Sequence, residues 1–226
     1  MSSLPTLRYI GMFVLVTGMI TGCTTETPKV SAAPVIVQPG APGEPGQTLP
    51  AASLSPVADV PFTAADVLFM QGMIPHHAQA LRMTGLVPSR STNRDITLIA
   101  KRIQASQEDE IALMRRWLQD RDQKVPDTNH DHSGTGGELM PGMLTEEQFA
   151  VLKKATGTDF DRAFVQSMIT HHLGALQMVD KLFNGDGGGG QETEIFTYAS
   201  HVGSDQRIEI DRMQKLLAQL DGRAPN

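Results

Sequence analysis

The chain has 226 residues, of which 40% are apolar, 19% charged and 5% aromatic, and this length is enough for one or two domains. A net charge of −6 argues against a general nucleic-acid binder, which would need a basic face. One cysteine excludes a disulfide scaffold and a cysteine-based zinc site, whereas the 12 methionines are an excess that invites explanation. Methionine fills cores, but its thioether is also a soft metal ligand.

The N-terminal segment, residues 1–22, is typical of a secretory signal peptide. Its apolar run from Tyr9 to Ile20 is too short for a membrane-spanning helix. The small residues before Cys23 resemble the lipobox of bacterial lipoproteins, which predicts that Cys23 is acylated and becomes the first residue of the mature protein. The alternative is an ordinary signal peptide with an incidental cysteine. A lipidated Cys23 would tether the protein to a membrane and leave soft-metal chemistry to methionine and histidine.

Residues 23–59 hold the lipidated cysteine and a proline-rich stretch. Seven prolines lie between Thr24 and Asp59, with small residues and few charges between them. Such a segment cannot bury enough surface to offset its chain entropy, so we predict a disordered, extended linker. The folded domain is then expected over residues 60–226.

The sequence of this domain contains an internal repeat. Residues 66–83 and 161–178 are related by an offset of 95, and ten of their 18 positions are identical. A second block, around Ala100 and again around Ala199, repeats at an offset of 99. The offset changes at the run Gly187–Gly190, where we predict a flexible loop. The domain divides into repeat one (60–122), a connector (123–144) and repeat two (145–221).

Each repeat is predicted to form a helical hairpin. Core-type residues recur at spacings of three and four in four segments, which is the period of an amphipathic helix. These segments are residues 66–83, 96–117, 161–178 and 195–216. Two hairpins can bury their apolar stripes against each other, so we predict an all-α four-helix bundle built from two repeated hairpins. Thr145 with Gln148 three residues later predicts a short capped helix over 145–155.

Four polar residue types recur on these inward stripes, where a plain bundle would carry apolar side chains. The pairs are Asp66/Asp161, His76/His171, Gln107/Gln206 and Glu110/Glu209. A buried carboxylate is costly without partners, so these groups must pair with one another, with water or with a metal. One interpretation is a hydrogen-bond network that fixes the helix register. The other is metal ligation, which the neighbouring imidazoles of His77 and His172 favour.

The candidate ligands in the bundle combine imidazole, thioether and carboxylate groups. Adjacent helix residues point about 100° apart, so His76 and His77 are not expected to chelate one ion together. Thioether with imidazole suits Cu(I), and imidazole with carboxylate suits Cu(II) or zinc. A di-iron centre would need Glu-x-x-His, which neither repeat contains. The candidates are Met73, His76, His77, Met83, Glu110 and Met114 in repeat one, and Met168, His171, His172, Met178, Glu209 and Met213 in repeat two.

The connector carries a second candidate ligand set. His130 and His132 are followed by Met140 and Met143 in a glycine-rich stretch that we predict to be flexible. A His-x-His pair on a surface is often only a solvated loop, but exposed methionines have little packing reason to be there. We therefore include all four residues among the candidate metal ligands.

These motifs together resemble a known family. Met73-Ile74-Pro75-His76-His77, Met168-Ile169-Thr170-His171-His172 and Met140-Pro141-Gly142-Met143 look like the bacterial domain-of-unknown-function family 305, over about residues 60–220. The resemblance implies a ferritin-like fold, a secreted or periplasmic location and copper binding through the methionine and histidine positions just quoted. The chain departs from an ideal repeat in having Thr170 where the first copy has Pro75.

The leading functional hypothesis is a copper-binding protein of the cell envelope. It would be lipid-anchored, face the periplasm or the extracellular side, and sequester or hand on Cu(I) or Cu(II) without catalysis, with zinc or iron as alternative metals. Its partners would be the metal ion, the membrane through the anchor, and a copper-transfer partner that the sequence does not identify. One alternative is a metal-dependent oxidoreductase on the same bundle, with Glu110 and Glu209 as acid/base candidates. The other is a structural envelope module whose polar core only specifies register.

Overall fold

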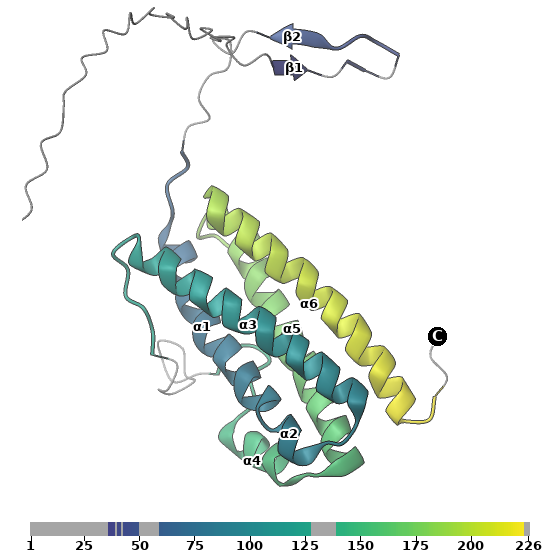
Figure 1. Ribbon diagram of the computed structural model, residues 1–226. Coiled ribbons are helices and arrows are strands. Elements are labelled where there is room, and N and C mark those ends of the chain that lie inside the picture. The colour runs from purple at the N-terminus through teal and green to yellow at the C-terminus, as the bar shows by residue number, and fades with distance from the viewer. Residues whose placement is uncertain (1–35, 39, 42, 50–58, 128–138, 224–226) are drawn as a thin grey trace, which may run out of the picture. The chain divides into compact units, whose positions relative to one another are not determined.

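The structure is a computed structural model that describes residues 36–38, 40–41, 43–49, 59–127 and 139–223. Cys23, His130 and His132 lie outside the described residues. The chain divides into two compact units, residues 1–57 and 58–226. The elements, labelled in Figure 1, are β1 (Ile36–Gln38), β2 (Gln47–Leu49), α1 (Ala64–Thr84), α2 (Val87–Arg90), α3 (Arg94–Gln119), α4 (Glu146–Lys154), α5 (Gly157–Asn184) and α6 (Thr193–Leu220).

The first unit contains a small antiparallel hairpin. β1 pairs with β2 in the register Ile36–Leu49, Val37–Thr48 and Gln38–Gln47. The chain reverses through a turn in which the Glu44 amide donates to the Ala41 carbonyl at 2.8 Å, with Gly43 at a φ of +94°. The proline-rich composition of this segment predicted an extended linker and did not anticipate strand pairing.

The second unit is a bundle of four long helices, which Figure 1 shows running alongside one another. α1 packs against α3 and α5 packs against α6, so each repeat forms one helical hairpin. The two hairpins meet through α1 and α5, and the short helices α2 and α4 lie at one end of the bundle. The all-α four-helix bundle of two repeated hairpins is therefore confirmed. None of the described helices is both long and apolar enough to cross a membrane.

Polar side chains cap the first turns of α1, α3 and α6, whereas Thr156, the residue before α5, makes no such hydrogen bond. Thr63 and Asp66 form a reciprocal capping box at the start of α1, and Asn93 caps α3 through two backbone amides. Glu192 caps α6 by accepting from the Ile195 amide at 2.9 Å. The predicted capping box of α4 is confirmed, since Thr145 and Gln148 each accept from the other's backbone amide.

The glycine run between α5 and α6 is a loop, as predicted, but part of it packs against α1. The Gly190 amide donates to Asp66 Oδ1 at 2.6 Å, and both Gly189 and Gly190 are buried. A Cβ atom on Gly189 would lie 2.6 Å from Leu182 Cδ1, so the chain passes too close for a side chain. Asp66, near the start of α1, thus holds the loop between α5 and α6 against repeat one.

Apolar side chains pack in two separate clusters along the bundle. The first cluster includes Ile103, Phe160 and Phe164 and extends to α2 and α4. The second cluster includes Trp117 and Ile195 near the opposite end. Each long helix contributes to both clusters, one with its N-terminal half and the other with its C-terminal half, so the apolar core is interrupted at mid-height.

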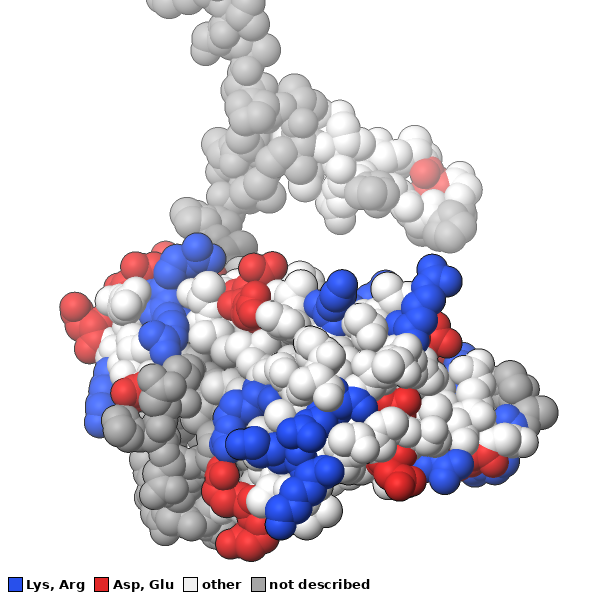
Figure 2. Space-filling model, turned by 60° about the horizontal axis from the view of Figure 1, so that its bottom comes forward, with Lys and Arg blue, Asp and Glu red and all other residues white. Residues whose placement is uncertain are grey.

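The surface carries charges of both signs. On the face in Figure 2, basic side chains gather near the centre, with acidic ones beside them and around the edge. Charged groups are ordinarily kept at such a surface because burial of an unpaired charge is costly. The polar residues that interrupt the core at mid-height are exceptions to this rule.

Candidate metal centre

The interruption between the two apolar clusters is a layer of eight polar side chains, two from each long helix. This polar layer consists of His76, His77, Gln107, Glu110, His171, His172, Gln206 and Glu209. All four histidines have an exposed fraction of 0%, and the side chain of Glu110 is the most exposed member at 19%. The structure therefore brings the four predicted histidines of the bundle and both glutamates to one level of the fold.

Two of the histidines are each held by a glutamate of the same hairpin. His77 Nε2 lies 2.5 Å from Glu110 Oε2, and His172 Nε2 lies 2.7 Å from Glu209 Oε2. A carboxylate accepts, so in the neutral ring the proton sits on Nε2 and the lone pair on Nδ1. Nδ1 of both rings is buried and has no hydrogen-bond partner among the described residues. The two pairs occupy equivalent positions in the two repeats.

The other two histidines meet each other across the junction between the hairpins. The ring centroids of His76 and His171 are 3.9 Å apart, with 37° between the ring planes. In contrast, the adjacent rings of His76 and His77 are 6.3 Å apart, as are those of His171 and His172. Neighbours in sequence thus point apart, as their helical spacing predicted, and the close contact joins the two repeats.

His76 and His171 are neutral at physiological pH. Burial lowers the pKa of His76 from 6.5 to about 3, and the neighbouring His77 contributes to the same shift. Burial also holds the pKa of His171 well below its ordinary value, with His76 as the next cause. His76 Nε2 donates to the Pro141 carbonyl at 3.0 Å, which leaves the lone pair on Nδ1. Neutral imidazole is the form that binds metal ions.

Several polar atoms of this layer have no hydrogen-bond partner within the described part of the chain. They include Nδ1 of all four histidines, Nε2 of His171, and amide atoms of Gln107 and Gln206. A buried polar atom without a partner costs about 1–3 kcal/mol, and native proteins rarely tolerate many of them. The network interpretation, in which these groups satisfy one another, therefore accounts for the His–Glu pairs but not for the remaining atoms.

The predicted methionines flank the polar layer on both sides. Met73, Met114 and Met178 lie with the second apolar cluster, and Met83, Met168 and Met213 lie with the first. Each set contains two methionines of one repeat and one of the other. Five of the six are fully buried, and Met178 is partly buried. The pairing of the repeats therefore places three thioethers above the histidines and three below.

At the end of the connector, Met143 and Leu144 are buried against the bundle, although the sequence suggested exposed methionines, while Leu139 and Pro141 stay exposed. Met143 is only 8% exposed, and Gln79 holds the next residue, Leu144, through two 2.8 Å hydrogen bonds to its backbone. A Cβ atom on Gly174 would lie 1.9 Å from the Pro141 carbonyl oxygen. Gly142, with a φ of +76°, also runs close to α5. We call residues Met140–Leu144 the strap.

The strap brings one connector thioether to the bundle. A Cβ atom on Gly72 would lie 3.4 Å from both Met140 Sδ and Met178 Cε, so these two side chains share the same notch on α1. Gly72 is one helical turn before His76, whose ring hydrogen bond reaches the strap at Pro141. Met140 and Met178 therefore lie together beside the polar layer.

A buried tyrosine borders the layer, and the sequence reasoning missed it. Tyr198 of α6 packs edge-on against Phe69, with ring centroids 6.2 Å apart, and its hydroxyl has no hydrogen-bond partner among the described residues. Burial raises the pKa of Tyr198 well above its ordinary value, and the nearby charge of Glu110 raises it further. The signal available in the sequence was a difference between repeats, because the offset of 99 places Ile99 at the equivalent position.

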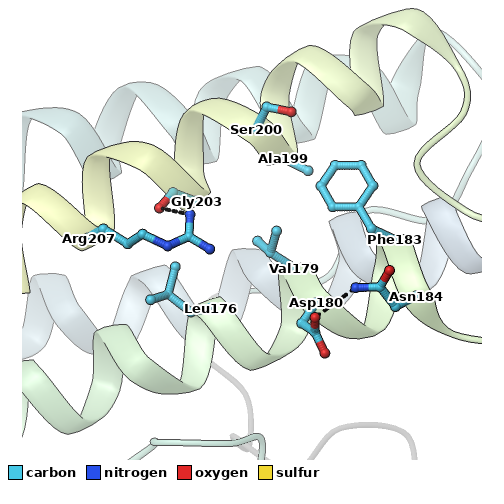
Figure 3. A pocket seen from close by; sticks show the side chains of 9 residues that line it. All are labelled: Leu176, Val179, Asp180, Phe183, Asn184, Ala199, Ser200, Gly203 and Arg207. Atoms are coloured by element: carbon cyan, nitrogen blue, oxygen red, sulfur yellow. Dashed lines mark hydrogen bonds between the residues drawn. The ribbon is translucent and has the colours of Figure 1, made fainter.

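A separate cavity of about 310 Å³ lies between α5 and α6, shown in Figure 3. Its lining is apolar in the middle, with Arg207 at one end and Asp180 and Asn184 at the other. Arg207 donates to the Gly203 carbonyl, and Asn184 donates to Asp180, each at 2.8 Å. None of the candidate metal ligands lines this cavity.

Within the described residues, no three His, Asp or Glu side chains already converge as a metal site. Glu110 and Glu209 are engaged by His77 and His172, and Asp66 is engaged at the end of the bundle. The unpartnered atoms of the layer are imidazole nitrogens and amide atoms of Gln107 and Gln206, and the imidazole nitrogens have thioethers on either side. Such a donor set is soft to borderline and fits copper by its chemistry.

The fold and this layer define a class of helical proteins made from two hairpins with a doubled His-His motif. The model of the family "domain of unknown function (DUF305)" matches residues 66–220, and the chain belongs to this family. Among curated proteins, none matches the chain.

Solved structures of the family share the fold. A DUF305 protein from Streptomyces coelicolor is 25% identical, with a TM-score of 0.60, over 72% of this chain and 96% of that one. A DUF305 fragment from Deinococcus radiodurans is 30% identical, with a TM-score of 0.60, over 71% and 99%. CopM in its Cu(II)-bound form is 26% identical, with a TM-score of 0.56, over 68% and 96%, and CopM has also been solved with Cu(I). These likenesses confirm the ferritin-like helical bundle.

Proposed function

We propose that this protein binds copper in the polar layer, and that it sequesters or transfers the ion without catalysis. The observation that carries the proposal is the state of the imidazoles. Three of the four hold Nε2 against an acceptor (Glu110, Glu209 or the Pro141 carbonyl) and leave a buried Nδ1 without a hydrogen-bond partner among the described residues. A histidine that ligates a metal usually donates its other ring N–H to a carboxylate or carbonyl in this way.

The glutamates then have a different role from the one predicted. Glu110 and Glu209 would orient His77 and His172 and increase the basicity of their rings, rather than coordinate the ion themselves. The ligands would be imidazole nitrogens of the layer and thioethers from the flanking methionines. This ligand set suits Cu(I). Copper is also the metal bound in the solved structures of the relative CopM.

Copper titration of the mature protein tests the proposal. Competition with a chromophoric Cu(I) chelator is expected to show binding much tighter than millimolar in the wild type. His77→Gln and His172→Gln should each weaken it at least about tenfold, because a positioned ligand is lost. His201→Gln, at an exposed position of α6, is the control and should leave the affinity unchanged. Wild-type affinity weaker than about millimolar would refute the function.

The thioethers are tested separately by nearly isosteric replacements. Met73→Leu and Met168→Leu conserve volume and burial, so they should cost less than about 1.5 kcal/mol in stability but weaken Cu(I) binding. Met70→Leu is the matched control, because Met70 is equally buried in α1 and has Val165 at the equivalent position of repeat two. If Met70→Leu and Met73→Leu weakened Cu(I) binding equally, the thioethers would be core residues and not ligands.

The location of the protein is a further part of the proposal. We infer that residues 1–22 are a signal peptide, that Cys23 is acylated, and that the linker to residue 59 tethers the domain of residues 60–226 outside the cytoplasm. A palmitate label in growing cells should enter the wild-type protein and not Cys23→Ser, which should become soluble in the periplasm or medium. Equal release of both proteins would mean an ordinary signal peptide.

A further inference from the structure

Two methionines differ from the others in their exposure to solvent. Among the methionines of the described residues, only Met140 and Met178 are partly exposed, and the rest are buried. Met140 lies in the strap, and Met178 lies in α5, packed against the second apolar cluster. A buried thioether fills space in a core, whereas a thioether within reach of solvent is also accessible to a soft metal ion.

These two side chains meet although they come from different parts of the chain. A Cβ atom on Gly72 of α1 would lie 3.4 Å from Met140 Sδ and 3.4 Å from Met178 Cε. Gly72 therefore leaves a notch that both methionine side chains reach, one from the strap and one from α5. Glycine within a helix costs about 1 kcal/mol relative to alanine. Repeat two has Ser167 at the equivalent position, so glycine is not a requirement of the repeated unit.

The strap holds Met140 in a defined place beside the polar layer. The Met143 amide donates to the Met140 carbonyl at 3.2 Å, and Gln79 anchors the end of the strap. The next residue, Pro141, accepts a hydrogen bond from His76 Nε2 through its carbonyl. A donor that is already in place loses less conformational freedom when it binds a ligand. The thioether of Met140 is therefore preorganised, and its neighbour in sequence contacts a histidine of the layer.

We propose that Met140 and Met178 form an outer position for a soft monovalent cation such as Cu(I), from which the ion passes to the imidazoles of the polar layer. Two neutral thioethers select Cu(I) over harder divalent ions. Because this pair offers two donors and no imidazole, it holds the ion more weakly than the layer does. Met178, the one partly exposed member of the flanking methionines, then belongs to the outer position. This inference rests on the proposed copper function and gives the strap a role in it.

Titration with Ag(I), a diamagnetic substitute for Cu(I), tests the outer position in protein labelled with ¹³C at the methionine methyl groups. The variants Met140→Leu and Met178→Leu assign the two methyl resonances and conserve side-chain volume. Both resonances should shift along one binding curve, and each variant should largely abolish the Ag(I) shift of the remaining partner. Met70→Leu, in the buried core of α1, is the control and should change neither shift. An unchanged Met178 shift in Met140→Leu would overturn the inference.

Passage of the ion to the layer is tested by the rate of loading. Cu(I) supplied from a chromophoric chelator should reach the layer several times more slowly in Met140→Leu, with the final affinity of the layer unchanged. Met70→Leu should load at the wild-type rate. Equal loading rates in Met140→Leu and the wild type would refute the exchange role.

The outer position and the proposed function fail in different ways. If the layer histidines responded to Ag(I) while Met140 and Met178 did not, the outer position alone would be refuted. If the wild type bound neither Ag(I) nor Cu(I), the proposed function itself would be refuted.

Discussion

At the scale of single residues, the unusual feature is a set of four imidazoles buried halfway along a helical bundle. Asp66 is also buried, but three hydrogen-bond donors surround it, the Thr63 amide and hydroxyl and the Gly190 amide. Several buried polar atoms of the polar layer, in contrast, have no hydrogen-bond partner among the described residues. Asp66 therefore has hydrogen-bond partners from the start of α1 and from the loop before α6, whereas the histidines of the polar layer keep buried nitrogens without partners among the described residues.

The histidines make the metal-free protein sensitive to mild acid. The folded chain keeps His76 neutral down to a pH of about 3, while the unfolded chain takes up the proton near pH 6.5. Stability from this group is therefore complete above pH 6.5 and is lost as the pH falls towards 3, at about 1.4 kcal/mol per pH unit. His171 acts in the same direction.

Urea unfolding at several values between about pH 7 and pH 5 measures this slope. The double variant His76→Gln/His171→Gln should flatten it, because no buried imidazole is left to protonate at these two positions. The new amide side chain in place of His76 can still donate to the Pro141 carbonyl. His201→Gln is the control and should keep the wild-type slope. A double variant as acid-sensitive as the wild type would show that other groups cause the loss of stability.

At the scale of elements, the sequence predicted what lies within one helix and missed what lies between helices. The spacing of three and four located all four long helices, and the Thr145–Gln148 pair located α4. The contact of His76 with His171 depends on the position of α1 along the axis of α5, and no local sequence pattern encodes that register. The strap was misread for the same reason, since its glycine serves a contact with α5 and not flexibility.

Gly174 gives a test of the strap. In Gly174→Ala the new methyl would lie 1.9 Å from the Pro141 oxygen and 2.7 Å from Gly142 Cα, so the backbone must move, at a cost of about 1–3 kcal/mol. Gly72→Ala is the matched control in α1, where the methyl meets Met140 and Met178 at 3.4 Å. It should be neutral or stabilise by up to about 1 kcal/mol through helix propensity. Denaturant midpoints that fall equally in both variants would mean that the strap contact is unimportant.

At the scale of the whole bundle, the two repeats form one centre. Each apolar cluster combines the N-terminal halves of some helices with the C-terminal halves of others, so neither hairpin has a complete core or a complete methionine set alone. The sequence could show that six methionines recur in pairs. Only the packing of α1 on α5 shows that three of these methionines lie on each side of the histidines, and that each group of three includes methionines of both repeats.

Metal binding should therefore stabilise both hairpins together. Copper at about 100 times its dissociation constant is expected to add about 2.7 kcal/mol to the free energy of unfolding. Because the polar layer draws two residues from each of α1, α3, α5 and α6, hydrogen-exchange protection should rise in all four helices at once. A variant with all four layer histidines replaced by glutamine should gain none. Protection that rose in α1 and α3 but not in α5 and α6 would confine the site to repeat one and contradict a shared centre.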